Sequence, residues 1–239
     1  MEWKTKISNF TEEESTIRGF NHDNLIGKIS FSSMIYLLLK GRMPNENESK
    51  LLDAIFVSCI DHGIAPPSII SARSVASGGN SLNSSVAAGI MALGDYHGGA
   101  IEDAAKLFSS SLEVSSLVKT YLDEKIRLPG FGHKIYKESD PRTKKLFALA
   151  QELNLAGKYS EIAFQMENEI FKQKGKKFCL NVDGMIAALV LDLGFSYTTG
   201  KIFFIISRTP GICAHVHEEI TEEKPFRRLK TNQTKYLGK

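Results

Sequence analysis

Cysteine is scarce in this chain, and its three copies, Cys59, Cys179 and Cys213, lie far apart in apolar stretches. No CxxC pair occurs, so neither a disulfide framework nor a zinc site is indicated, and we expect three small buried side chains. No apolar signal core follows Met1, and the longest strongly apolar runs, such as Ile202–Ile206, are far shorter than the roughly 20 residues that cross a bilayer. These absences predict a cytoplasmic protein that has no membrane partner.

Several signatures of enzyme chemistry are also missing. The sequence has no Walker loop, no GxGxxG, no Gly-x-Ser-x-Gly and no HExxH. His215, His217 and Glu218 form a compact cluster, but a His and a Glu on a helix surface usually pair with each other or with water, so we predict no metal site. The 30 basic and 27 acidic residues give a net charge of +3, which is too small to indicate nucleic acid. The 239 residues, 42% apolar and 24% charged, suit one large globular domain or two coupled ones.

Helix signals follow one another along the chain. A Ser start, an apolar body and a Lys-Gly stop predict a capped helix over 30–41. Asp140-Pro141-Arg142 predicts a helix start, because Asp accepts from the first N–H groups and Pro suits the first helical position; this helix should continue to Gly157. Other helices are expected after Asn45, from Ser81 with Leu82, Val86, Ile90 and Leu93 inward, over Ala100–Phe108, through Ile162–Ile170, over Met185–Leu193 and over Thr209–Glu219. Residues 172–177 suit an exposed connector, and Ile202–Ile206 alone would suit a strand. Without any alternating pattern or hairpin signal, the sequence predicts an all-α protein.

Four glycine-bordered segments between these helices carry titratable groups: residues 61–63, 94–99, 128–133 and 181–184. The backbone can approach a ligand closely there, and N–H groups at helix ends can bind anions. His62, His97 and His133 could transfer protons or polarise a carbonyl. One such histidine alone is more often a capped or buried side chain. Three of them together with Asp183 favour an active site, because active sites draw residues from several loops.

Arginines could bind a polycarboxylate. Arg142, Arg208, Arg227 and Arg228 can each hold a carboxylate through two parallel hydrogen bonds. Most arginines are surface or salt-bridge residues. Arg208 differs because it follows an apolar run, where a charge needs a partner or a ligand.

Four ordered motifs resemble the citrate synthase superfamily: Gly130-Phe131-Gly132-His133, Asp140-Pro141-Arg142, Asn181-Val182-Asp183 and Ser207-Arg208-Thr209. The resemblance covers about residues 18–225. It implies a multihelical fold with a large domain (1–96, with 194–239 returning to it) and a smaller coenzyme A-binding subdomain (97–193). It also implies a homodimer or a higher oligomer of dimers, no permanently bound cofactor, and a coenzyme A thioester as substrate.

The resemblance further implies residue roles. Asp183 would take a proton from the acetyl-CoA methyl group or return it during cleavage. Because a carboxylate with a pKa of about 3.9 is too weak a base by itself, His97 would stabilise the enolate, a contribution of about 3–4 kcal/mol for one such donor. His133 would bind the oxaloacetate carbonyl and accept the citryl hydroxyl proton in cleavage. His62, Arg142 and Arg208 would hold the carboxylates.

The coenzyme would lie along the loop before His133. The resemblance implies that Leu128, Pro129, Gly130, Phe131 and Gly132 wrap the adenine, with Asn181 nearby. Lys134, Lys137, Lys176 and Lys177 would meet the phosphates, although each lysine alone is more typical of a solvated surface.

Two departures from the synthase pattern concern the direction of the reaction. In this chain only 16 residues separate Pro44 from Asp61, whereas synthases have a long helical insertion there. Residues 59–63 read Cys-Ile-Asp-His-Gly, whereas synthases carry His-x-Asp-His-Glu at this place. Both features resemble the citryl-CoA lyase module of ATP-citrate lyase. A third departure is Lys224-Pro225, where the family has Arg-Pro. The substrate contact that the family's arginine makes could pass to Arg227 or Arg228.

The sequence therefore predicts a lyase of citrate metabolism, including the reductive TCA cycle, which splits citryl-CoA into acetyl-CoA and oxaloacetate. A citryl-CoA synthetase, the ligase that forms citryl-CoA, is a candidate partner. The alternatives are a citrate or 2-methylcitrate synthase and a non-catalytic coenzyme A-binding or partner subunit.

Overall fold

The computed structural model describes residues 2–238, and the chain forms two compact units. The first comprises residues 1–58 and 101–200, and the second comprises residues 59–100 and 201–239. The large and small subdomains expected above divide the chain at other positions, and that division stays a prediction. Within residues 2–238, no helix combines the length and the apolar character that crossing a membrane requires.

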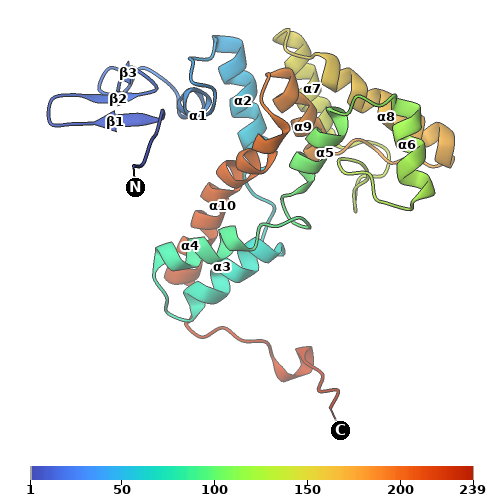
Figure 1. Ribbon diagram of the computed structural model, residues 1–239. Coiled ribbons are helices and arrows are strands. Elements are labelled where there is room, and N and C mark those ends of the chain that lie inside the picture. The colour runs from blue at the N-terminus through green and yellow to red at the C-terminus, as the bar shows by residue number, and fades with distance from the viewer. Residues whose placement is uncertain (1, 239) are drawn as a thin grey trace. The chain divides into compact units, whose positions relative to one another are not determined.

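The first unit is mostly helical. A small antiparallel sheet with the order β1-β2-β3 precedes the helices. The elements are β1 (Ser8–Phe10), β2 (Ser15–Ile17), β3 (Phe20–Asn21), α1 (Phe31–Lys40), α2 (Glu46–Ser58), α5 (Ala100–Phe108, starting at the unit boundary), α6 (Val114–Asp123), α7 (Pro141–Glu152), α8 (Lys158–Lys174), α9 (Val182–Asp192) and a 3-10 turn at Tyr197–Thr199 (Figure 1). The multihelical fold is confirmed, but the strands were not predicted: they are two or three residues long, and β1 is exposed throughout.

Helix α9 forms the centre of the first unit. Every residue from Val182 to Leu191 is buried except Asp183, and α7 and α8 pack against it. Burying one such aliphatic side chain stabilises a fold by about 1.5–3 kcal/mol. The expected buried helix is therefore confirmed, and within its first turn only Asp183 is partly exposed.

Local capping explains where the helices begin and end. Ser30 accepts a hydrogen bond from the Ser33 N–H at 3.1 Å, and Gly41 ends α1 with φ of +77°, as the sequence predicts. Helix α7 begins after Asp140 as predicted, but it ends at Glu152 instead of continuing to Gly157. The chain turns there because Asn154 adopts a positive φ of +56°, a left-handed conformation that Asn tolerates.

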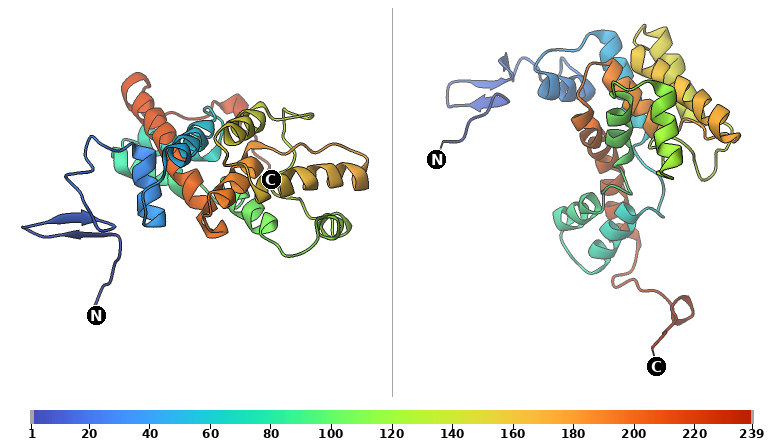
Figure 2. Two further views of the ribbon diagram at one scale, coloured as in Figure 1. Left: turned by 90° about the horizontal axis from the view of Figure 1, so that it is seen from above. Right: turned by 45° about the vertical axis from the view of Figure 1, so that its right-hand side comes forward.

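The second unit contains α3 (Pro67–Ser77), α4 (Leu82–Met91), α10 (Gly200–Glu222, apart from its first residue) and a 3-10 turn at Thr231–Gln233. Figures 1 and 2 show α3 and α4 side by side against α10. Their shared core consists of Ile69, Ala72, Ala76, Ile212 and Val216, with Val86 and Ile90 packed against it.

Some expectations for this unit were wrong. Leu82, expected inward, occupies the first position of α4 and is 51% exposed. Ile202–Ile206 belongs to α10, which continues through Pro210. Of the cysteines, Cys59 and Cys179 are buried, whereas Cys213 is partly exposed.

Candidate functional site

In the first unit the predicted residues gather around Asp140, which caps α7 and is fully buried. Its carboxylate accepts from Arg142 Nε at 3.0 Å and Nη2 at 2.8 Å, and from the Val182 N–H at 3.1 Å. Burial alone would raise the pKa of Asp140, but the hydrogen bonds from Arg142 and Val182 prevail and hold it below its ordinary value. The ionised carboxylate therefore fixes the Arg142 guanidinium and ties it to the start of α9.

Asp183 lies in the first turn of α9 and is half-buried. The positive end of a helix favours an acidic side chain at this position. Burial opposes the charge on Arg142, but Asp140 and then Asp183 raise the pKa of Arg142. The structure therefore brings Asp183 and Arg142, both predicted site residues, into one electrostatic group.

The orientation of His133 follows from its backbone contacts. Nδ1 accepts hydrogen bonds from the Ile135 N–H at 3.2 Å and the Tyr136 N–H at 3.1 Å. A nitrogen that accepts carries no proton, so in the neutral ring the proton lies on Nε2. Nε2 is 3.4 Å from Arg142 Nη2, and both groups are donors. Two donors this close can share one acceptor oxygen, such as a ketone or a carboxylate.

The loop before His133 runs antiparallel to residues 179–181. The Gly132 N–H donates to Cys179 O at 2.7 Å, and the Asn181 N–H donates to Gly130 O at 3.0 Å. The Asn181 side chain donates to Gly132 O at 2.9 Å and also caps α9. Asn181 thus fixes the loop to the helix that carries Asp183.

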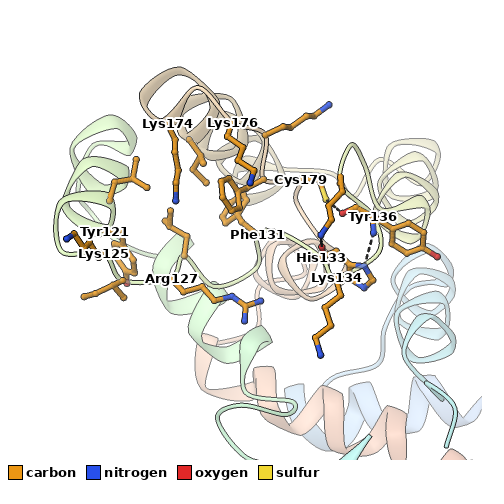
Figure 3. A pocket seen from close by; sticks show the side chains of 18 residues that line it. Tyr121, Lys125, Arg127, Phe131, His133, Lys134, Tyr136, Lys174, Lys176 and Cys179 are labelled. Atoms are coloured by element: carbon orange, nitrogen blue, oxygen red, sulfur yellow. Dashed lines mark hydrogen bonds between the residues drawn. The ribbon is translucent and has the colours of Figure 1, made fainter. Parts of the chain in front are cut away.

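A cavity of about 760 Å³ opens beside this loop. Tyr121, Leu122, Ile126, Leu128, Phe131, Ile170 and Phe178 give it an apolar lining. Seven cationic side chains also line it: Lys125, Arg127, Lys134, Lys137, Lys174, Lys176 and Lys177. Figure 3 shows Lys174 and Lys176 on one side and Arg127 and Lys134 on the other. Among the described residues that line it, none is Asp or Glu, so the cavity suits a ligand with both an apolar part and several negative charges.

Most of the residues expected at the coenzyme lie at this cavity. Leu128, Phe131, Gly132 and Lys134 line it, and so do Lys137, Lys176 and Lys177. Pro129, Gly130 and Asn181 are not in the lining and belong to the loop and its anchor. Sequence reasoning missed Lys125, Arg127 and Lys174, because only the fold brings the end of α6 and the end of α8 to one cavity.

In the second unit, His97 is half-buried and its Nε2 lies 2.8 Å from Ser68 Oγ. Ser68 is fully buried, and the Phe204 ring stands edge-on to the imidazole at 6.1 Å between centroids. Burial lowers the pKa of His97, and the charges of Arg208 and His62 lower it further. His97 is therefore neutral at pH 7. Ser68 was not predicted, since no sequence pattern links it to a histidine 29 residues away.

Arg208 is only 4% exposed. Its Nε donates to Cys59 O at 3.0 Å, and its guanidinium carbon lies 4.9 Å from the centre of the Phe204 ring, a favourable cation–π geometry. His62 is exposed next to Asp61. Burial opposes ionisation of Asp61, but the N–H groups of Gly63 and His62, together with His215, hold its pKa below the ordinary value.

The C-terminal arginines lie in other surroundings. Arg227 forms ion pairs with Glu219 at 3.2 Å and Glu223 at 3.0 Å. Arg228 is exposed, with its guanidinium 5.9 Å from the Phe226 ring. Their contact with substrate carboxylates stays a prediction.

In the histidine cluster on α10, the His215 side chain lies beside acidic groups. His215 lies 3.1 Å from an Asp61 carboxylate oxygen and 3.8 Å from one of Glu218. Across residues 2–238, no three His, Cys, Asp or Glu side chains are grouped as a metal ion requires.

With this geometry established, the chain can be compared with known proteins. Residues 44–229 match the family model for the citrate synthase C-terminal domain. The chain is 33% identical to the citrate synthase of Saccharolobus solfataricus over 87% of its own length and 57% of that protein. It is 31% identical to ATP-citrate synthase beta chain protein 1 of Arabidopsis thaliana over 75% of its own length and 33% of that protein. It thus spans little more than half the length of the curated citrate synthases it matches.

Solved structures extend the comparison. The citryl-CoA lyase from Hydrogenobacter thermophilus has 51% sequence identity and a TM-score of 0.95, covering 99% of this chain and 95% of that one. The ATP citrate lyase from Methanothrix soehngenii, solved with citrate and coenzyme A, has 25% identity and a TM-score of 0.89, covering all of this chain and 42% of that one. On these matches and its helical fold, the chain belongs to the citrate synthase family.

Proposed function

We propose that this protein is a citryl-CoA lyase, which cleaves citryl-CoA to acetyl-CoA and oxaloacetate. The observation that carries the proposal is the 51% identity with the Hydrogenobacter thermophilus lyase over nearly the full length of both chains. The connection between Pro44 and Asp61 also supports it, because it contains only helix α2, whereas synthases have a longer helical insertion there.

The cavity of the first unit would hold the coenzyme. The seven cationic side chains would attract the phosphates of coenzyme A, and the apolar lining would contact its adenine. The Phe131–Gly132 backbone at the cavity edge is fixed by its pairing with residues 179–181. The thioester arm would leave the cavity near His133, which belongs both to the lining and to the Arg142 group.

The citryl part needs donors for its oxygens. His133 Nε2–H and the Arg142 guanidinium would share the oxygen that is a hydroxyl in citryl-CoA and a ketone in oxaloacetate, or a neighbouring carboxylate oxygen. As the carbon–carbon bond breaks, the hydroxyl loses its proton. An Nε2 that already carries a proton does not suit the acceptor role expected of His133, so the Asp183 carboxylate would accept this proton. Arg208 and His62 of the second unit would supply further carboxylate contacts.

Carbon–carbon cleavage leaves the acetyl part as an enolate. When His97 Nε2 accepts a hydrogen bond from the Ser68 hydroxyl, the neutral imidazole carries its proton on Nδ1 and would donate a hydrogen bond from there to the enolate oxygen. A donor of this kind contributes about 3–4 kcal/mol to transition-state stabilisation. Asp183 would return a proton to carbon and complete acetyl-CoA.

Product analysis separates the lyase from its runner-up. The purified protein is mixed with citryl-CoA, and acetyl-CoA, oxaloacetate, citrate and free coenzyme A are followed over time. Stoichiometric acetyl-CoA and oxaloacetate supports the lyase. The 33% identity with a citrate synthase favours the alternative, and citrate with free coenzyme A as products would overturn the proposal in its favour.

Asp183→Asn tests whether the site is catalytic. The substitution keeps the shape of the side chain but removes the proton-transferring carboxyl group, so cleavage should fall by about 10²–10⁴-fold. Asp123→Asn is the matched control, since Asp123 is exposed on α6 and pairs with Lys119. Unchanged cleavage by folded Asp183→Asn protein would favour a non-catalytic coenzyme A-binding or partner subunit.

A further inference from the structure

The ring of Tyr136 is stacked on the imidazole of His133. The two ring centroids are 4.7 Å apart and the planes are inclined by 21°. The Tyr136 N–H also donates to His133 Nδ1 at 3.1 Å. One residue therefore contacts both the face of the imidazole and its accepting nitrogen, and Figure 3 shows the two side chains next to each other at one end of the cavity.

Two backbone hydrogen bonds meet the imidazole at Nδ1. Both N–H···Nδ1 distances, 3.1 and 3.2 Å, are at the long end of the usual range. Rotation of the ring would move Nε2 away from Arg142 Nη2, its neighbour at 3.4 Å. The stacked tyrosine ring resists that rotation, and it keeps Nδ1 against the two N–H groups that select the Nε2–H tautomer.

Tyr136 is itself anchored to the core of the first unit. Its carbonyl oxygen accepts from Cys179 Sγ at 3.4 Å, and Cys179 is 1% exposed. Its ring also lines the cavity, as His133 does. A ligand in the cavity therefore contacts both stacked rings. The orientation of the His133 ring then decides whether Nε2–H points at the substrate.

We propose that Tyr136 is the positioning residue for His133: its ring holds the imidazole in the orientation and tautomer in which Nε2–H and the Arg142 guanidinium address one acceptor oxygen. The inference rests on the proposed function for its kinetic consequences. Its structural content concerns His133 alone and can be tested without turnover.

The kinetic test compares Tyr136→Leu with Tyr136→Phe. Loss of the stack in Tyr136→Leu should lower kcat for citryl-CoA cleavage about tenfold, with a rise in KM no larger than that of Tyr121→Leu, whereas Tyr136→Phe keeps the ring and should retain kcat within about twofold. Tyr121→Leu is the matched control: Tyr121 lines the same cavity from α6. It should raise KM without the tenfold fall in kcat. Equal losses of kcat in the Phe and Leu variants would overturn the proposal.

The second test needs no activity. ¹⁵N chemical shifts of labelled histidine report which ring nitrogen carries the proton, and His133→Asn identifies the His133 signals. Wild type and Tyr136→Phe should show one tautomer, Nε2–H, whereas Tyr136→Leu should show averaged shifts of two tautomers. An Nε2–H tautomer unchanged in folded Tyr136→Leu refutes the positioning role even if the protein cleaves citryl-CoA. If wild type does not cleave citryl-CoA but the shifts change as expected, the proposed function fails and the positioning role stands.

Discussion

His97 and His133 are held by different kinds of partner. His97 faces the Ser68 hydroxyl through Nε2, whereas His133 Nδ1 faces two backbone N–H groups. A hydroxyl can donate or accept, so Ser68 is compatible with either tautomer of a neutral ring. A backbone N–H only donates, so Nδ1 of His133 is an acceptor as long as it faces these two groups. Because burial and then the charge of Arg208 lower the pKa of His97, it stays neutral down to a lower pH than an ordinary histidine.

Ser68→Ala should reduce catalysis without unfolding the protein. The substitution removes the Ser68 hydroxyl that lies 2.8 Å from His97 Nε2, so the imidazole is less well ordered and kcat should fall about tenfold. The measurement is kcat for citryl-CoA cleavage, with the urea unfolding midpoint recorded alongside. Ser84→Ala on α4 is the control, since Ser84 is exposed and its hydroxyl bonds only locally with Ser81. Equal kcat values for the two variants would contradict the role of Ser68.

The sequence could identify residues that act, but not residues that hold them in place. His97, His133 and Asp183 are predictable because each stands beside a glycine in a segment between the helices expected from the sequence. Ser68 and Tyr136 belong to no such pattern: the first lies 29 residues from its histidine, and a tyrosine three residues after a histidine stacks on it only in this particular turn.

At the scale of elements, the start of α9 and the loop at Gly130 approach each other closely. A Cβ on Gly184 would lie 2.6 Å from Gly130 O, and a Cβ on Gly130 would lie 2.8 Å from Gly184 Cα. Gly130 also has a φ of +84°, which favours glycine. The close approach positions the loop that forms the cavity edge directly over the helix that carries Asp183.

Gly184→Ala should therefore destabilise the protein. In an ordinary helix, Gly→Ala stabilises by up to about 1 kcal/mol, but here the new methyl group collides with backbone, and the net cost should be about 1–2 kcal/mol. The urea unfolding midpoint measures it. Gly78→Ala is the control, because its φ is −76° and an added Cβ meets nothing closer than 3.4 Å. A Gly184→Ala protein as stable as the control would show that the loop yields without cost.

Helix starts were predictable because capping is local: Ser30 and Asp140 accept from N–H groups two or three residues ahead. The end of α7 could not be predicted, because the left-handed turn is made by Asn154 and residues 151–156 contain neither glycine nor proline. The strands at residues 8–21 are two or three residues long, which is too short for an alternating pattern to show. For the whole molecule, long-range packing decides the grouping of the chain, and the two compact units divide it at positions that no linker composition indicates.

Charge is unevenly distributed over the molecule. The net charge is +3, from 30 basic and 27 acidic residues. Seven of the basic residues line one cavity without an acidic neighbour in its lining. The rest of the chain therefore holds 23 basic residues against the same 27 acidic ones, and is net negative. An anionic coenzyme would be attracted to the cavity and repelled by the average surface elsewhere.

The double substitution Lys174→Gln and Lys176→Gln should weaken binding of the coenzyme portion. Removing two of the seven cations should raise KM for citryl-CoA about tenfold and leave kcat within about twofold, because neither lysine contacts the reacting carbons in the proposed reaction. Between about 50 and 300 mM salt, KM of the wild type should rise more steeply than KM of the variant, as screening weakens the contacts that the variant lacks. Lys119→Gln is the control: it removes one positive charge from α6, where Lys119 pairs with Asp123 outside the cavity lining. If Lys119→Gln raised KM as much as the double variant, net charge and not the cavity would govern binding.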